Sequence, residues 1–339
     1  MSEPAEVKVR EVHPGFHLVY LPLPMKPTIV NVYLVDGGSE WGLIDTGMYT
    51  EESVKAFRSA LDIAGCPPQK IRKIICTHHH PDHFGTSRFY QQLCHAEVFL
   101  HPLEAAHVTR FLPQPRSPDT VRFFEKNGIP IESFAKVPSL GEFWKDMYAP
   151  ARPDHPLVDR DRIAIGERTL EAVWTPGHSP GHCVMYFRRE RVVVVGDHLL
   201  PKITPHVGIL SDDAGDPLGD FLASLRKVGD LDVETVLPAH GAVYHDHRKR
   251  VTQLIEFHDY RMQVMLDVIR GRPRTAYDVA LEAFDLTPQS PFQQQFPATF
   301  ETLAHLEHMR LEGRTEKFDV DGRVVWRPKP ASVGVRRLC

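Results

Sequence analysis

The stretch Thr77-His-His-His-Pro-Asp-His83 is the part of the sequence from which the fold and the chemistry can be worked out. It directly follows Ile71-Arg-Lys-Ile-Ile-Cys76, a mostly apolar run that predicts a buried strand. Imidazoles and a carboxylate with this spacing can converge from one loop on two neighbouring cations. The sequence therefore predicts a metal-binding loop at the end of a strand, with the candidate ligands His78, His80, Asp82 and His83.

Three further candidate ligands each follow another predicted strand. They are His178 in Thr175-Pro-Gly-His-Ser-Pro-Gly-His182, Asp197 after the aliphatic run 192–195, and His240 in Leu237-Pro-Ala-His-Gly241. Imidazole suits zinc, iron, nickel and copper, carboxylate oxygen suits harder ions, and the set contains no thiolate. Zinc is the expected metal, with iron or manganese as alternatives. His79 points away from its neighbours in an extended segment, so we expect it behind the ligands or at the surface.

The first 247 residues mix strands and helices, which indicates a mixed α/β domain. Strands are predicted at 31–35, 42–45, 71–76, 170–174, 183–187, 192–195 and 235–237, and an amphipathic helix at 51–64. Residues 104–161 interrupt this alternation with eight prolines and seven aromatic residues, and we interpret them as an insertion. Its aromatic side chains either pack the insertion onto the body or form an apolar wall for substrate.

A change of pattern near Arg248 indicates a second domain over 248–339. Helices are predicted at 251–270, 275–284 and 298–311, and Asp321-Gly322 between two short apolar runs favours a β-hairpin. Three helices followed by a hairpin resemble a winged helix. This region carries 15 Lys and Arg against 12 Asp and Glu, which is weak for a nucleic-acid reader. We therefore expect a packing or dimerisation module that closes one side of the active site.

The composition excludes several classes of protein. The chain has 339 residues, 42% hydrophobic and 25% charged, which is ordinary for a globular protein. A formal charge of −4 provides no overall positive field for nucleic acid or anionic lipid. No apolar run approaches the roughly 20 residues of a membrane-spanning helix, and no apolar signal core begins the chain, so a cytoplasmic protein without a membrane partner is expected. Five scattered cysteines argue against a disulfide scaffold.

The order of these motifs resembles the metallo-β-lactamase superfamily, in which H-x-H-x-D-H is followed by G-H, by G-D and by a further His. The resemblance covers roughly residues 13–247 and implies an αββα sandwich, with two mixed sheets face to face, helices outside, and the site at one edge. It also implies a role for each candidate ligand: His78, His80 and His178 would bind one metal, Asp82, His83 and His240 a second, and Asp197 would bridge them. Asp45 in Ile44-Asp-Thr-Gly47 would orient a ligand from behind.

A site of this kind predicts metal-assisted hydrolysis. Water bound to catalytic zinc has its pKa lowered to roughly 7, so a metal-bridging hydroxide would be the nucleophile. Asp82 is the expected catalytic residue, since it would orient the hydroxide and pass its proton to the leaving group. The resemblance to glyoxalase II thioesterases and lactonases favours an ester, thioester or lactone bond in a small-molecule substrate. The basic C-terminal motif that holds glutathione in glyoxalase II is not found in the sequence, which argues against a glutathione thioester.

Two alternatives are kept. Superfamily members with a winged-helix tail include RNA-cleaving enzymes, so a phosphodiesterase or endoribonuclease is the second hypothesis, with nucleic acid as its partner. The third is a mononuclear iron dioxygenase, because persulfide dioxygenases share the scaffold. Antibiotic hydrolysis is not expected, since true β-lactamases of the superfamily have no aspartate at the bridging position. The physiological substrate, the native metal and the formation of a homodimer are left open.

Overall fold

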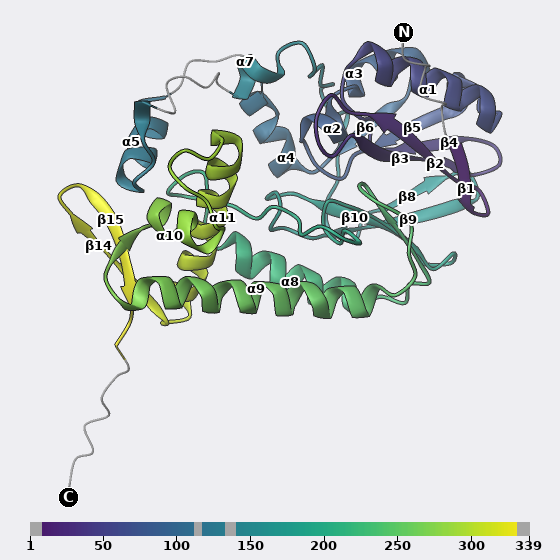
Figure 1. Ribbon diagram of the computed structural model, residues 1–339. Helices are drawn as coiled ribbons and strands as arrows, with labels where there is room; N and C mark the ends of the chain where they lie inside the picture. The colour runs from purple at the N-terminus through teal and green to yellow at the C-terminus, as the bar shows by residue number, and fades with distance from the viewer. Residues whose placement is uncertain (1–8, 112–116, 133–139, 331–339) are drawn as a thin grey trace, which may run out of the picture. The chain divides into compact units, whose positions relative to one another are not determined.

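The computed structural model describes residues 9–111, 117–132 and 140–330, which fall into two units (Figure 1). Within the described residues, the first unit holds 9–111, 140–205 and 220–254, and the second holds 117–132, 206–219 and 255–330. All seven candidate ligands lie in the first unit. Among the described helices, none is both long and apolar enough to cross a membrane.

Two mixed β-sheets form the centre of the first unit. The seven strands of the first sheet follow chain order: β1 (Val9–His13), β2 (Phe16–Pro22), β3 (Ile29–Asp36), β4 (Trp41–Ile44), β5 (Ile71–Ile75), β6 (Glu97–Leu100) and β7 (His155–Pro156). The strands β1 to β4 pair antiparallel and β4 to β7 pair parallel. The second sheet has the order β12-β11-β10-β9-β8, with bounds β8 (Arg162–Ile165), β9 (Arg168–Trp174), β10 (Cys183–Phe187), β11 (Val192–Gly196) and β12 (Thr235–Pro238).

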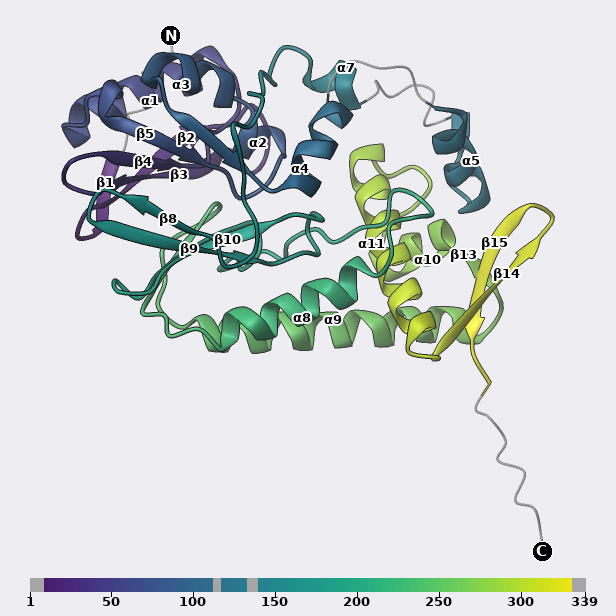
Figure 2. The ribbon, with the colours of Figure 1, turned by 180° about the vertical axis from the view of Figure 1, so that it is seen from behind.

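The two sheets pack against each other through their inner faces. Fully buried side chains from both sheets share one hydrophobic cluster, among them Phe16, Tyr33 and Ile75 from the first and Leu170, Met185 and Val194 from the second. The outer face of the first sheet is covered by α1 (Glu51–Ala64) and α3 (Ser87–Cys94), whose Phe57 and Tyr90 rings stack 4.0 Å apart. Residues 220–229 of α8 (Pro217–Gly229) cover the second sheet (Figure 2), with Ser224 Oγ donating to the Pro176 carbonyl at 2.9 Å. The predicted αββα sandwich is confirmed.

The first helix shows why these residues form these elements. Thr50 caps α1, because its side chain accepts a hydrogen bond from the Ser53 backbone N–H at 3.1 Å, and two glutamates occupy the first turn. Buried positions recur at helical spacing: Ser53, Ala56, Phe57, Ala60 and Leu61. The helix ends at Ala64, and the capping residue Gly65 has the left-handed φ of 66° that glycine adopts without strain.

The second unit contains the C-terminal helices and a small sheet. Its helices are α5 (Pro118–Lys126), the part of α9 (His247–Arg270) beyond residue 254, α10 (Ala276–Ala283) and α11 (Phe292–Leu311). Its three strands have the order β13-β15-β14, with bounds β13 (Arg274–Thr275), β14 (Thr315–Val320) and β15 (Arg323–Pro328). The predicted C-terminal helical region is present, and β14 and β15 form the predicted hairpin, with Val320 paired to Arg323. The winged-helix interpretation stays a prediction.

One helix begins earlier than the sequence predicts. The predicted start is Ala298, whereas α11 begins at Phe292 and continues through Pro297. Proline cannot donate the hydrogen bond to the carbonyl four positions before it, which belongs to Gln293, and its ring crowds that carbonyl. Because Gln293 is exposed, water can satisfy its carbonyl, and the helix continues.

The region interpreted as an insertion is divided between the two units. Residues 104–111 and 140–161 belong to the first unit and include most of α4 (Pro102–His107) and all of α7 (Leu140–Trp144). In the second unit, α5 places the Phe124 ring 4.9 Å from that of Phe296 and 5.7 Å from that of Phe300. The Tyr277 N–H donates to the Asn127 carbonyl at 3.2 Å. These aromatics of α5 therefore pack within the second unit, while Phe134 lies outside the described residues.

Candidate metal centre

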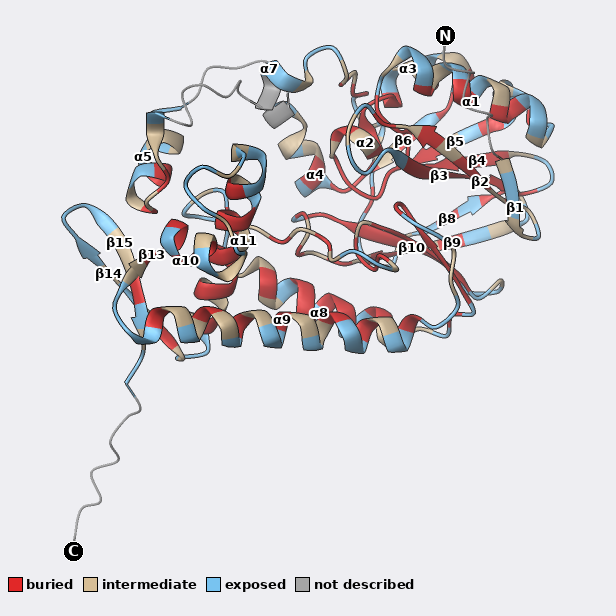
Figure 3. Cartoon of the chain, in the orientation of Figure 1, coloured by how far each residue is buried: buried red, intermediate tan, exposed pale blue. Residues whose placement is uncertain are grey.

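The candidate ligands lie where strands end, on loops that meet at one edge of the sandwich. Both β9 and β11 pair antiparallel with β10, and β12 pairs parallel with β11, so β9, β11 and β12 all end at the same edge. His178, Asp197 and His240 follow these three strands. The first sheet contributes the loop after β5 and the short helix α2 (Pro81–Phe84), and the Cys183 N–H joins the two sheets by donating to the Thr77 carbonyl at 3.0 Å. The loops are largely buried (Figure 3).

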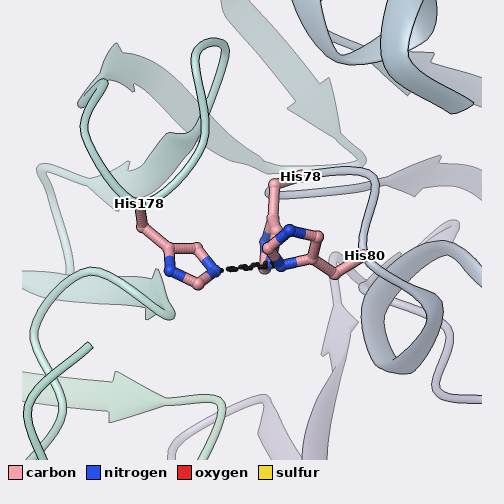
Figure 4. Close-up of side chains that lie close together, drawn as sticks. All are labelled: His78, His80 and His178. Atoms are coloured by element: carbon pink, nitrogen blue, oxygen red, sulfur yellow. Dashed lines mark hydrogen bonds between the residues drawn. The ribbon is translucent and has the colours of Figure 1, made fainter. Parts of the chain in front are cut away.

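Three imidazoles converge to form the first ligand group, defined as His78, His80 and His178. The His80 Nδ1 atom lies 2.9 Å from His78 Nε2 and 3.0 Å from His178 Nε2, and the two Nε2 atoms are 3.3 Å apart. Figure 4 shows the three rings pointing toward one another from two separate loops. Tetrahedral zinc with Zn–N bonds of about 2.0–2.1 Å holds its nitrogen ligands about 3.3 Å apart. The spacing of the three nitrogens therefore fits a single zinc-sized ion.

The second ligand group is defined as Asp82, His83 and His240. The Asp82 Oδ2 atom lies 3.3 Å from His240 Nε2 and 3.6 Å from His83 Nε2. Asp197 reaches both groups, since its Oδ2 lies 3.7 Å from His178 Nε2 and 3.6 Å from His83 Nε2, while its Oδ1 lies 3.4 Å from His240 Nε2. The structure thus brings all seven predicted side chains together.

The chemistry of these side chains fits a pair of divalent cations. Five imidazoles and two carboxylates, without a thiolate, match the ligands that zinc, iron or manganese take in proteins. Two buried atoms of the site, His83 Nε2 and Asp197 Oδ1, make no hydrogen bond in the described structure. Buried polar atoms are normally paired, so two orphaned atoms that face other ligands are what a cation site requires.

Asp45 supports the second ligand group from behind, as the family resemblance implied. It is buried in the left-handed conformation, with φ of 60°, which is uncommon for a residue other than glycine. Its Oδ1 accepts from the Thr77 N–H at 2.8 Å, and its Oδ2 lies 2.9 Å from His83 Nδ1. A carboxylate on one ring nitrogen fixes the orientation of the ring and leaves His83 Nε2 facing the site.

A second support holds the loop of His240, and sequence reasoning did not find it. The Asn31 side-chain amide donates to the carbonyls of Pro238 and Gly241 at 2.8 and 2.9 Å, and the Tyr33 hydroxyl donates to Pro238 at 2.7 Å. The Ile29 carbonyl lies 3.0 Å from His240 Nδ1. Strand β3 of the first sheet therefore positions a ligand that belongs to the second sheet.

Burial and charge prepare the site for cations. Burial, and after it the neighbouring imidazoles, lower the pKa values of His78 and His80 well below the usual range, so both rings are neutral ligands. Burial would also lower the pKa of His83, but the carboxylates of Asp82 and Asp197 raise it well above its ordinary value. A cation bound at His83 would take the place of a proton there, so its affinity would rise with pH.

Two further histidines of the motifs have structural partners. His79 is buried, with only 4% of its surface exposed, and its Nδ1 contacts the Glu104 carboxylate. His182 Nδ1 lies 2.9 Å from Thr175 Oγ1. Glycine is required before Asp197 for a steric reason, because a Cβ at Gly196 would lie 2.7 Å from His182 Nε2.

Comparisons with known proteins agree with this geometry. The model of the family "Metallo-beta-lactamase superfamily" matches residues 25–240. The probable metallo-hydrolase YqjP of Bacillus subtilis (strain 168) is 26% identical over 309 residues, covering 87% of this chain and 92% of that protein. An atrochrysone carboxyl ACP thioesterase of Aspergillus fumigatus is 25% identical over 251 residues, covering 73% of this chain and 63% of that protein.

Solved structures give the same result. A metallo-beta-lactamase family protein from Thermus thermophilus is 33% identical with a TM-score of 0.80, covering 94% of this chain and 100% of that one. A beta-lactamase domain protein from Burkholderia ambifaria is 25% identical with a TM-score of 0.83, covering 96% of this chain and 95% of that one. The family model spans well over half of the sequence, and the chain belongs to the metallo-beta-lactamase superfamily.

Proposed function

We propose that the protein is a dinuclear metal-dependent hydrolase that cleaves an ester, thioester or lactone in a small-molecule substrate. The observation that carries the proposal is the position of Asp197. Its two oxygens lie 3.7 Å from a nitrogen of the first ligand group and 3.4 Å from a nitrogen of the second, so one carboxylate can serve both ions. Zinc is the first choice of metal, and iron and manganese are the alternatives, because the donor set suits all three.

Two divalent cations in this site would supply a nucleophile from water near neutral pH and would polarise the carbonyl oxygen under attack. The residue placed to handle the proton is Asp82, whose side chain is 21% exposed and whose Oδ2 lies 3.3 Å from His240 Nε2. Burial raises the pKa of Asp82, but the charge of His83 and the hydrogen bond to His240 lower it below the ordinary value. The carboxylate is therefore ionised at neutral pH and able to accept a proton and pass it to the leaving group.

The choice of an acyl substrate is supported by the relatives. A match to a protein described as a thioesterase favours hydrolysis of an acyl bond, and one to a protein described as a probable metallo-hydrolase favours metal-dependent hydrolysis. This support is an analogy between relatives, because one fold hosts many substrates.

The charges of the second unit do not favour RNA cleavage. In a winged helix that reads nucleic acid, the third helix presents basic side chains to the groove. Apart from its histidines, α11 carries one basic residue, Arg310, against the acidic residues Glu301 and Glu307, and Arg310 donates to Glu307 at 2.6 Å. Two basic side chains of the hairpin formed by β14 and β15 are also paired with acids: Arg327 Nε donates to Glu316 at 2.6 Å, and Lys317 Nζ donates to Glu307 at 2.9 Å.

A panel of substrates on metal-analysed protein tests the proposal. Metal-free protein reconstituted separately with Zn²⁺, Fe²⁺ and Mn²⁺ is assayed against acyl-thioesters, lactones and bis(p-nitrophenyl) phosphate, with oxygen consumption recorded in parallel. We expect acyl hydrolysis that rises with metal content to two ions per chain. Activity confined to the phosphodiester would support the RNA-cleaving alternative, and oxygen uptake with one iron per chain would support the dioxygenase.

A pair of histidines from one segment provides the control. His240→Ala removes a ligand of the second group, whereas His245→Ala removes an exposed imidazole five residues later. We expect the first variant to lose activity and one ion, and the second to keep both. Equal activity of the two variants would contradict the proposal.

A further inference from the structure

A buried glutamate lies behind the two loops that carry the first ligand group. Glu104 belongs to the first turn of α4, and its side chain has no exposed surface. Its Oε2 accepts a hydrogen bond from the His79 backbone N–H at 2.9 Å and also contacts His79 Nδ1. Its Oε1 accepts from the Gly181 backbone N–H at 2.5 Å. One carboxylate therefore joins the loop after β5 to the loop before β10.

These two loops come from different sheets, and the first ligand group depends on both. The loop after β5 supplies His78 and His80, and the loop before β10 supplies His178. A metal ion requires its ligands within about 0.2 Å of their bonding distances. His79 lies between the ligands His78 and His80 in the sequence. A connection between the loops at His79 therefore acts directly on the distance from these two ligands to His178.

The carboxylate is well satisfied as an anion. Burial would raise the pKa of Glu104, but the hydrogen bond from the His79 side chain, the charge of that ring and the two backbone N–H groups lower it to about 2. All of its partners approach as donors, so the group is held by charge-assisted hydrogen bonds. Asp45 makes a similar set of contacts behind the second ligand group. Its carboxylate also binds a backbone N–H and an imidazole.

The residues around Glu104 pack closely against its side chain. A Cβ at Gly181 would lie 2.9 Å from Glu104 Cγ and 2.5 Å from His101 Nδ1, so only glycine fits there. His101 begins α4 by accepting from the Leu103 N–H at 3.1 Å, and its ring lies parallel to that of Trp174 at 5.8 Å. On the other side, the Tyr148 hydroxyl donates to the His79 carbonyl at 2.9 Å. Both backbone groups of His79 are thus held.

We infer that Glu104 is a positioning residue that joins the two loops of the first ligand group and thereby sets the affinity of that group for its metal ion. The inference rests on the proposed dinuclear site. Replacement by glutamine keeps the shape but offers only one acceptor oxygen, and it turns an N–H₂ toward a backbone N–H of either His79 or Gly181. One of the two loops is then released. Loss of such a support typically weakens metal binding about 10- to 100-fold.

The test measures Zn²⁺ affinity in two backgrounds that each keep one ligand group. His240→Ala retains the first group, and His178→Ala retains the second. Glu104→Gln is introduced into both, with Glu97→Gln as the matched control, since Glu97 is an exposed glutamate on β6. Competition against a chromophoric chelator gives each dissociation constant, and the visible spectrum of the Co²⁺ form reports the geometry around the ion.

We expect Glu104→Gln to weaken Zn²⁺ about 10- to 100-fold in the His240→Ala background and to shift the Co²⁺ bands there. In the His178→Ala background it should behave as Glu97→Gln does. Equal weakening in both backgrounds, or none in the first, would overturn the inference.

Glu104→Asp keeps the test open if Glu104→Gln does not fold, because it keeps the carboxylate but shortens the side chain by one methylene, so that it can no longer reach the backbone N–H groups of both His79 and Gly181. It should weaken the first group alone by a few-fold, and unchanged affinity would overturn the inference. Absence of Zn²⁺ binding in the unmodified protein would overturn the inference and the proposed function together. Binding of two ions without acyl hydrolysis would overturn only the proposed function.

Discussion

Glu301→Gln replaces a buried carboxylic acid of α11 by an amide of nearly the same shape. The Glu301 side chain is 14% exposed, and its Oε2 lies 3.9 Å from His206 Nδ1. Burial raises the pKa of this carboxyl from 4.5 to about 7, although the Arg261 guanidinium acts in the opposite direction. In the unfolded chain the same group returns to its ordinary pKa, so folding and ionisation are coupled.

The sign of the effect follows from which state holds the proton. Between pH 4.5 and 7 the folded protein keeps a proton that the unfolded chain has released, so the free energy of unfolding falls as the pH rises through this window. Above pH 7 this loss of stability is complete. A shift of the pKa from 4.5 to about 7 corresponds to about 3 kcal/mol in the free energy of unfolding. Glutamine does not ionise. The variant should therefore be more stable than the unmodified protein by about 3 kcal/mol at pH 8 and by less than about 1 kcal/mol at pH 5.

Urea unfolding followed by circular dichroism at pH 5 and pH 8 checks this expectation. Glu256→Gln is the control, because it makes the same chemical change at an exposed position of α9. Comparing the two variants at each pH cancels the contributions of all other titrating groups to the free energy of unfolding. An equal gain of stability at both pH values, or a loss of stability at pH 8, would refute the argument that burial raises the pKa of Glu301.

Two further predictions concern the site and the second unit. Asp197→Ala should lower the occupancy of both metal ions together, measured by elemental analysis after gel filtration, with the exposed Asp230→Ala as control; two retained ions would contradict a bridging role. Gly128→Ala should lower the free energy of unfolding by about 1–3 kcal/mol more than Gly215→Ala does. Both glycines have a left-handed φ, but a Cβ at Gly128 would lie 2.4 Å from Thr275 Oγ1, whereas nothing lies within 4 Å at Gly215. Equal melting temperatures would show that Thr275 can move aside.

Much of the site could be predicted because its signals are local in the sequence. Each candidate ligand follows a short apolar run, and strands that end at one sheet edge bring their following residues together. A glycine beside a ligand also indicates a crowded site, since Gly196 leaves space for His182 and Thr77. Family resemblance then arranged the ligands in two groups, and the distances agree with that arrangement.

The supports of the ligands could not be predicted, because they act across long stretches of chain. Glu104 contacts a residue 77 positions later, and Asn31 reaches a carbonyl 207 positions later. Each is a single polar residue outside any metal-binding motif. Pro102 with an acidic residue two positions later does indicate the start of a helix, but nothing in the sequence tells which loop that acid will contact. The sequence likewise does not show that α5 belongs to the second unit, because its contacts are with residues far along the chain.

The route of the chain between the units has a practical consequence. The chain enters the second unit at α5, leaves it, returns for residues 206–219, leaves again, and enters for the last time within α9. A stop codon after residue 254 would remove the rings that Phe124 contacts and would strand α5 as bare aromatic surface, a liability for aggregation. Neither a single nick nor a simple truncation can give two intact halves. Any experiment that separates the C-terminal helices from the candidate metal centre must therefore redesign α5 as well.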